Sequence, residues 1–256
     1  MSRSAEPILI DSISCHLVRD LPSIGEGDDL AAMIEDRFAL RNGDVVCIAS
    51  TVVSKSEGRL RKLEEYSPSP QAKKVARVLD KDPRFVQAVL EESKEVLIDR
   101  PFLLVATSFG HIGVNAGIDQ SNVGQGRILL LPIDPGASAD RIRRGLEKDC
   151  AVIVTDTCGR PFRCGVAGVA IGWSGIAPLR DWRGKRDLEG RELEITLEAI
   201  VDEIAGMANF LMGEGGDGTP AVVFRGLKYP KLGGRLFRPK DLDVIRDRLK
   251  VEDRRS

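Results

Sequence analysis

The sequence predicts a protein of helices and strands mixed along one chain and folded into two closely joined lobes. The chain has 256 residues, enough for one large domain or two small ones with a core well beyond the marginal size. Short apolar runs rich in β-branched residues recur along it and predict buried strands. Other segments carry a capping residue before a proline, or apolar residues at helical spacing, and these predict helices.

The strands are predicted from apolar runs four to seven residues long. The run at 151–155 is expected to stop at Asp156, and the last run directly follows a glycine-rich segment. The runs are PILI (7–10), VVCIA (45–49), PFLLVAT (101–107), RILLLPI (127–133), AVIVT (151–155) and PAVVF (220–224).

The helices are predicted from their first residues and from spacing. Ser69 and Asp82 each precede a proline, which is the arrangement of an N-cap followed by the first helical position. Ser138 is expected to cap a third helix. From 193 to 211 the apolar residues recur at helical spacing, which predicts a long helix that runs into the glycine-rich segment.

Composition excludes several classes of function. The chain carries 38 basic and 39 acidic residues, a net charge of -1, and no basic stripe interleaved with aromatic residues, so no nucleic-acid partner is expected. No apolar run has the length of a signal-peptide core or of a membrane span, and we expect a cytoplasmic protein without membrane contact. Five cysteines without a CxxC pair are expected to stay reduced, and two histidines nearly exclude a His-rich metal site.

Polar residues after the strand at 151–155 are the first candidates for chemistry. Asp156 and Thr157 offer a carboxylate and a hydroxyl to a hard cation, and open α/β sheets bind ligands at the carboxyl ends of their strands. Asp119 and Asn122 lie in a second, glycine-containing turn. Each pattern taken alone is more often a helix cap or a turn.

The segment LMGEGGDGTP (211–220) holds four glycines together with Glu214 and Asp217. Glycine allows positive φ and close approach of the backbone, so such a loop can cradle phosphates while its carboxylates hold a cation. The alternative is a flexible linker in which Gly213 caps the preceding helix. The loop lacks the lysine of the P-loop pattern, so binding of the Walker type is not expected.

Two further segments are candidates for binding anions. Ser50, Thr51 and Lys55 follow the strand at 45–49 and offer hydroxyls and a cation to phosphate oxygens, although a solvated lysine is the commoner situation there. The arginine-rich segment at 180–194 has two equally good interpretations: a binding site for an acidic substrate, or the solvated start of a helix.

Seven segments in this order closely resemble the coenzyme F420-0:L-glutamate ligase family, also called F420-0:γ-glutamyl ligase. Each segment alone would be a weak match to the family, but the seven in this order, which extend from 21 to 227, make the resemblance specific. The segments are LPSIGEGDDL, ASTVVSKSEGR, FVQAVLEES, VNAGIDQSNV, TDTCGRPFR, DWRGKRDLEGRELE and LMGEGGDGTPAVVFRGL.

The resemblance implies an enzyme that joins L-glutamate to the deazaflavin precursor F420-0 through amide bonds. Members of the family consume GTP, require two divalent cations, Mn²⁺ or Mg²⁺, and are stimulated by K⁺. The implied fold is an unusual α+β arrangement of two closely joined lobes that forms an intertwined homodimer. We expect one ligase domain over 1–256, without the C-terminal reductase-like domain of some larger relatives.

The resemblance also implies roles for particular residues. Asp119 and Asp156 would bind one cation, and Thr157 and Glu214 the second; no motif identifies a catalytic residue. A metal-dependent phosphohydrolase that uses the same carboxylates, and a nucleotide-binding module without turnover, are the alternatives. The expected GTP contacts are Leu21, Pro22, Ser23, Ile24, Ser50, Thr51, Lys55, Asn122, Met212, Gly213, Glu214, Gly215, Gly216, Asp217, Gly218 and Thr219.

Overall fold

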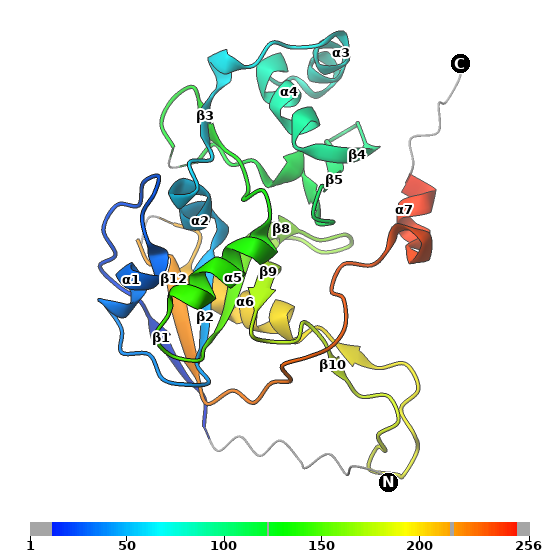
Figure 1. Cartoon of the computed structure of the whole chain (residues 1–256). Helices are drawn as coiled ribbons and strands as arrows, with labels where there is room; N and C mark the ends of the chain where they lie inside the picture. Colours follow the sequence, from blue (N-terminus) through cyan, green and yellow to red (C-terminus); the bar gives the residue numbers. More distant parts are fainter. Residues whose placement is uncertain (1–11, 122, 216–217, 250–256) are drawn as a thin grey trace.

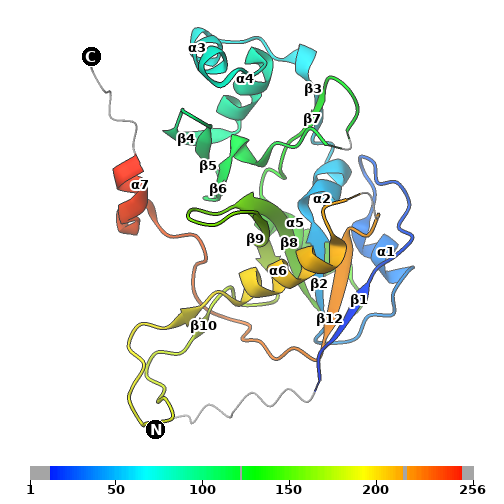
Figure 2. The ribbon, with the colours of Figure 1, turned by 180° about the vertical axis from the view of Figure 1, so that it is seen from behind.

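The computed structural model describes residues 12–121, 123–215 and 218–249. A central sheet carries helices on both faces, and a smaller group of helices and short strands lies at one end of it (Figures 1 and 2). The prediction of a fold that mixes helices and sheets is confirmed. None of the described helices is both long enough and apolar enough to cross a membrane.

The central sheet has five strands in the order β1-β12-β2-β8-β9. Strands β2 and β8 are parallel, and the other neighbouring pairs are antiparallel. The strands span Ser14–Leu17 (β1), Ala221–Arg225 (β12), Val45–Ala49 (β2), Ala151–Gly159 (β8) and Val166–Ser174 (β9).

The middle of this sheet is buried on both faces. In β2, Val46 and Ile48 pack with α1, α2 and α5, whereas Val45 and Cys47 pack against α6. A strand covered on both faces needs apolar residues at every position, which explains the unbroken apolar runs in the sequence. The four helices span Leu30–Glu35 (α1), Ser50–Ser56 (α2), Pro135–Gly145 (α5) and Ile200–Met212 (α6).

The smaller group has a hydrophobic core of its own, which includes Phe85, Leu103 and Ile128. The buried Arg59, just before this group, donates a hydrogen bond through Nε to the carbonyl of Leu131, just after it, at 2.9 Å and so joins the two ends of the segment. Its elements are β3 (Leu60–Lys62), a 3-10 helix (Leu63–Glu65), α3 (Pro70–Leu79), α4 (Pro83–Glu91), β4 (Ser93–Ile98), β5 (Leu104–Thr107), β6 (Ile112–Val114), a second 3-10 helix (Asn115–Gly117) and β7 (Arg127–Leu129).

The rest of the chain forms an arm and a C-terminal tail. The arm is closed by the pair β10 (Arg180–Asp181) and β11 (Leu197–Glu198) and projects from the body in Figure 1. The tail, residues 228–249, passes along the body and ends in a 3-10 helix (Lys240–Leu242) and α7 (Val244–Leu249).

Several predicted elements are confirmed at their first residue. The strand at 45–49 is β2, and the helices after Ser69 and Asp82 begin at Pro70 and Pro83. The Ser69 hydroxyl accepts from the Ala72 amide at 3.1 Å, as an N-cap does. The strand predicted at 220–224 is β12, which begins one residue later, at Ala221, whereas the strand predicted at 7–10 lies outside the described residues.

Other predictions were wrong at their boundaries. Asp134, not Ser138, caps α5, because its carboxylate accepts from the Ala137 amide at 2.9 Å and proline takes the first helical position. The helix expected from 193 begins at Ile200, because Leu197 pairs with the arm strand instead. The strand expected to stop at Asp156 continues to Gly159, because β9, which the apolar runs did not predict, pairs with it throughout.

The two strands predicted at 101–107 and 127–133 are shorter than expected. Pairing begins only at Leu104 in β5 and ends at Leu129 in β7.

Candidate functional site

Three segments that are far apart in the sequence meet at one edge of the central sheet. Because β2 and β8 are parallel, Ala49 at the end of β2 lies beside Thr155. Because β12 is antiparallel to β2, its first residue Ala221 lies opposite Ile48. The start of α2, the second half of β8 and the loop between α6 and β12 therefore converge at the edge where such sheets bind ligands.

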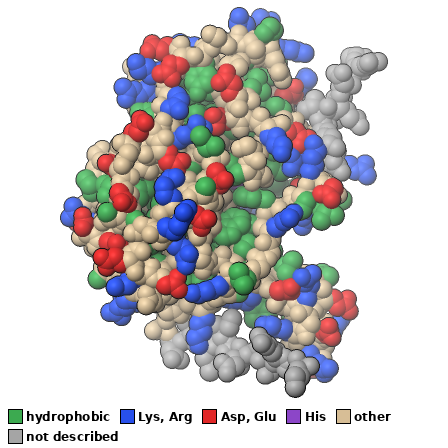
Figure 3. Space-filling model, viewed as in Figure 1, with side chains coloured by type: hydrophobic (Ala, Val, Ile, Leu, Met, Phe, Trp, Pro, Cys, Tyr) green, Lys and Arg blue, Asp and Glu red, His purple; other side chains and the backbone are tan. Residues whose placement is uncertain are grey.

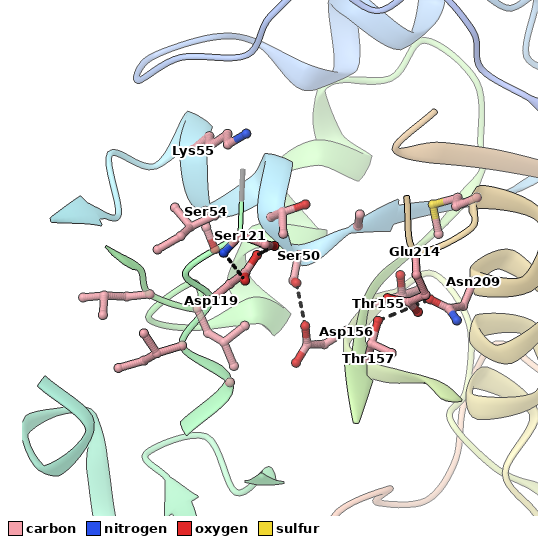
Figure 4. Close-up of a pocket in the computed structure, with 18 of the residues that line it drawn as sticks. Ser50, Ser54, Lys55, Asp119, Ser121, Thr155, Asp156, Thr157, Asn209 and Glu214 are labelled. Atoms are coloured by element: carbon pink, nitrogen blue, oxygen red, sulfur yellow. Dashed lines mark hydrogen bonds between the residues drawn. The ribbon is translucent and has the colours of Figure 1, made fainter. Parts of the chain in front are cut away.

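A cavity of about 410 Å³ opens at this edge, a volume typical of small-molecule sites. Figure 4 shows Asp119 on one side, Asp156 between, and Asn209 with Glu214 on the other. The polar residues that line it are Ser50, Thr51, Ser54, Lys55, Asp119, Ser121, Thr155, Asp156, Thr157, Asn209 and Glu214.

Asp156 lies at the centre of the cavity. Its Oδ1 accepts a hydrogen bond from the hydroxyl of Ser50 at 2.9 Å (Figure 4). Burial raises the pKa of this carboxyl from its usual value near 3.8 to about 6, and the charges of Asp119 and Glu214 add to the rise, while the Ser50 hydrogen bond opposes it. A cation bound at this site would therefore stabilise the ionised form of Asp156, whereas an anion bound without a cation would destabilise it.

Asp119 is held by its own turn. The amide and the hydroxyl of Ser121 donate to its two carboxylate oxygens, each at 2.7 Å. The backbone of Asp119 exchanges two hydrogen bonds with Leu129. Just before it, Gly117 has φ +67°, and a Cβ there would stand 2.5 Å from the Leu131 side chain, so only glycine lets this turn approach the cavity.

The other side of the cavity is formed by β8 and the end of α6. A β-bulge between Val154 and Thr155 precedes the polar residues of β8. The hydroxyl of Thr157 donates to Oδ1 of Asn209 on α6 at 3.3 Å.

After α6, Gly213 has φ 72° and ψ 174°, a backbone conformation that is almost confined to glycine. The alternative of a left-handed helical cap at this residue is therefore wrong. Gly213, Glu214 and Gly215 then line the cavity.

The structure brings most of the predicted site residues together, and their roles stay predictions. Leu21 and Ile24 pack against the hydrophobic core instead of lining the cavity. Gly218 and Thr219 do not line it either, and Asn122, Gly216 and Asp217 lie outside the described residues. Those that line it are Ser50, Thr51, Lys55, Asp119, Asp156, Thr157, Met212, Gly213, Glu214 and Gly215.

Sequence reasoning missed four polar residues of the cavity, namely Ser54, Ser121, Thr155 and Asn209. Ser54 lies one helical turn after Ser50 and Thr51, and Ser121 lies beside Asp119 and Asn122, so both were within reach of the local pattern. Asn209 had no local signal, because only the packing of α6 against β9 brings it to Thr157.

The donor atoms of the cavity suit a hard divalent cation, since they are carboxylate and hydroxyl oxygens. Within the described ranges, no group of three Asp, Glu, His or Cys residues is placed to hold an ion by itself. The expected arrangement needs only two protein residues for each ion. Mg²⁺ is commonly bound in this way, with phosphate oxygens and water at the other positions.

Comparison with known proteins adds an independent finding. The model of the family described as F420-0:Gamma-glutamyl ligase matches residues 19–226. The chain is 54% identical over 241 residues to a Halobacterium salinarum protein named coenzyme F420:L-glutamate ligase, covering 91% of this chain and 95% of that one. Proteins of the same name from Archaeoglobus fulgidus (55% over 239 residues, 91% and 96% covered) and Methanosarcina mazei (46% over 241 residues, 91% and 95% covered) are also similar.

Proposed function

The chain belongs to the F420-0:Gamma-glutamyl ligase family, and we propose that it joins L-glutamate to F420-0 by an amide bond in the biosynthesis of coenzyme F420. The observation that carries this proposal is the similarity to the named ligases over 91% of the chain. The cavity at the sheet edge, where carboxylates, hydroxyls and a lysine gather, is the proposed reaction site.

We propose that GTP supplies the energy for the reaction. An amide does not form from a free carboxylate and an amine without activation, and transfer of a phosphoryl group to the carboxylate provides it. Ser50 and Thr51 at the start of α2 and Lys55 in its last turn all line the cavity, and their hydroxyls and ammonium group suit phosphate oxygens. The family resemblance adds two further proposals, stimulation by K⁺ and a homodimeric assembly.

Two divalent cations, Mn²⁺ or Mg²⁺, would neutralise the negative charge of the phosphates. Asp119 and Asp156 would hold one and Thr157 and Glu214 the other. The raised pKa of Asp156 supports this assignment, because a cation would offset the cost of burying this charge and would also relieve the smaller repulsion from Asp119 and Glu214. Ser50 would keep the Asp156 carboxylate in place through the hydrogen bond to Oδ1.

The proposed reaction has two steps. A terminal carboxylate oxygen of F420-0 attacks the γ-phosphorus of GTP, and the bond between this phosphorus and the β,γ-bridging oxygen breaks. GDP departs, and F420-0 now carries an acyl phosphate. The amine of glutamate then attacks the acyl carbon, loses a proton, and expels inorganic phosphate. No covalent bond to the enzyme is required, so the proposed steps need none of the five cysteines as a nucleophile.

Mass spectrometry tests the ligation directly. The purified protein is incubated with GTP, Mn²⁺, F420-0 and glutamate, and we expect glutamate-sized increments in the mass of F420-0, with GDP and phosphate in equal amounts. With ¹⁸O in the terminal carboxylate, one labelled oxygen should appear in the phosphate. If the rate of GTP hydrolysis were the same with and without glutamate and F420-0, the result would favour a phosphohydrolase instead.

A further inference from the structure

A second hollow lies beside the free edge of β9, under the C-terminal tail. Two adjoining cavities of about 470 and 660 Å³ share Leu179, Leu197 and Arg235 in their walls and form one groove, which we call the tail groove. Figure 3 shows hydrophobic side chains in the hollow between body and tail, with Lys and Arg side chains along the tail. This groove is large enough for an extended small molecule.

The part of the tail groove nearest to β9 is apolar and aromatic. Val169, Ala170 and Phe237 line it, and the Phe237 ring lies 5.9 Å from Trp173 and 6.3 Å from His111, centre to centre. Burial lowers the pKa of His111 to about 4, so this ring is neutral at pH 7. Such walls suit a flat ring system.

The charges that line the tail groove are mostly positive and uncompensated. Arg183 is paired with Asp181 at 2.6 Å, and Asp202 is engaged with the amide of Ala170 at 2.9 Å. Four other cations line the groove without an ion pair to any residue that the structure describes. They are Lys185, Lys228, Arg235 and Arg238.

The tail groove is a close neighbour of the cavity at the sheet edge. Asp156, which lines the cavity, is paired with Val169, which lines the groove. Directly paired residues of antiparallel strands have Cα atoms about 5 Å apart and side chains on the same face. Likewise Val114 lines the cavity and His111 the groove, about 10 Å apart along an extended chain.

We propose that the tail groove binds the acceptor of the ligation, an anion with a planar aromatic ring, and that Arg235 and Arg238 hold its charged part. This inference rests on the proposed function, in which the acceptor is F420-0. The cavity at the sheet edge is assigned to GTP, and glutamate is too small to fill the groove. An acceptor in the groove can present its terminal carboxylate to the phosphates across the single pair of strands.

The test separates the groove from the ligase assignment. The double variant Arg235→Glu/Arg238→Glu is compared with the wild type for binding of F420-0, followed through deazaflavin fluorescence without GTP or metal, and for the KM of F420-0. Both side chains are exposed, so the melting temperature and GTP affinity should not change. We expect the Kd and KM for F420-0 to rise at least about tenfold, since a charge-assisted hydrogen bond contributes on that scale.

Arg77→Glu, on the exposed face of α3, is the matched control and should leave both constants unchanged. If the double variant unfolds, Arg235→Gln/Arg238→Gln replaces it. Unchanged F420-0 constants in a folded variant would overturn the groove assignment and leave the ligase intact. A wild type that forms no glutamylated product would overturn the proposed function, and the inference with it.

Discussion

Replacing Asp156 by asparagine should stabilise the ligand-free protein at neutral pH. The pKa of this carboxyl is raised from near 3.8 to about 6 in the folded protein. The folded state therefore holds a proton that the unfolded chain releases between about pH 4 and pH 6. The free energy of unfolding falls as pH rises through that interval, by about 3 kcal/mol at roughly 1.4 kcal/mol for each pH unit.

Asparagine carries no charge and keeps an Oδ1 that can accept from Ser50. We therefore expect Asp156→Asn to match the wild type near pH 4 and to exceed it by about 3 kcal/mol at pH 7.5. Urea unfolding in EDTA between pH 4 and pH 8 measures the difference. Asp80→Asn is the control, because Asp80 is exposed and its φ of 50° is a conformation that asparagine also adopts.

A difference between the two proteins that stayed constant with pH would refute this reasoning, because the effect would then not come from ionisation. With Mn²⁺ and GTP present, the proposed cation site predicts the opposite order of stability, because the wild type binds the cation and Asp156→Asn does not. Mn²⁺ with GTP should raise the melting temperature of the wild type, and Asp156→Asn should largely abolish the rise. An undiminished rise would remove Asp156 from the cation site.

Three further substitutions probe the cavity and the sheet. Gly215→Val should weaken GTP binding at least about tenfold in a calorimetric titration, because the added side chain would stand at the cavity wall. The protein should stay folded, because no atom lies within 4 Å of the added Cβ. Gly159→Val is the control, since its Cβ is equally unobstructed but lies outside the cavity, and it should bind GTP normally. Lys55→Gln should lower GTP affinity about tenfold and leave the melting temperature unchanged, and equal affinity would remove Lys55 from the phosphate site. Arg225→Met should lower the free energy of unfolding in urea by about 3 kcal/mol, because it leaves the buried carboxylate of Asp44, now paired with Arg225 at 2.7 Å, without its ion-pair partner. The affinity for GTP should not change.

Local patterns of the sequence determined the elements whose signals lie within a few residues. The helices at Ser69 and Asp82 begin where a capping side chain meets a proline, and both the cap and the restriction on φ act within one turn. The strand at 45–49 is apolar at every position because it is covered on both faces. The glycines and carboxylates of 213–218 likewise predict a binding loop; Gly213, Glu214 and Gly215 line the cavity, and their role stays a prediction.

The tertiary structure alone decided which of these segments meet. Ser50 and Asp156 are 106 residues apart and become partners because β2 and β8 pair in parallel register. Asp156 lies within a strand, and Leu197 outside a helix, because pairing with distant residues outweighs local preference. The tail groove exists because residues 228–239 return to the edge of β9. Contacts of this kind form between chain segments whose own sequences carry no trace of the partner, so no local pattern can specify them.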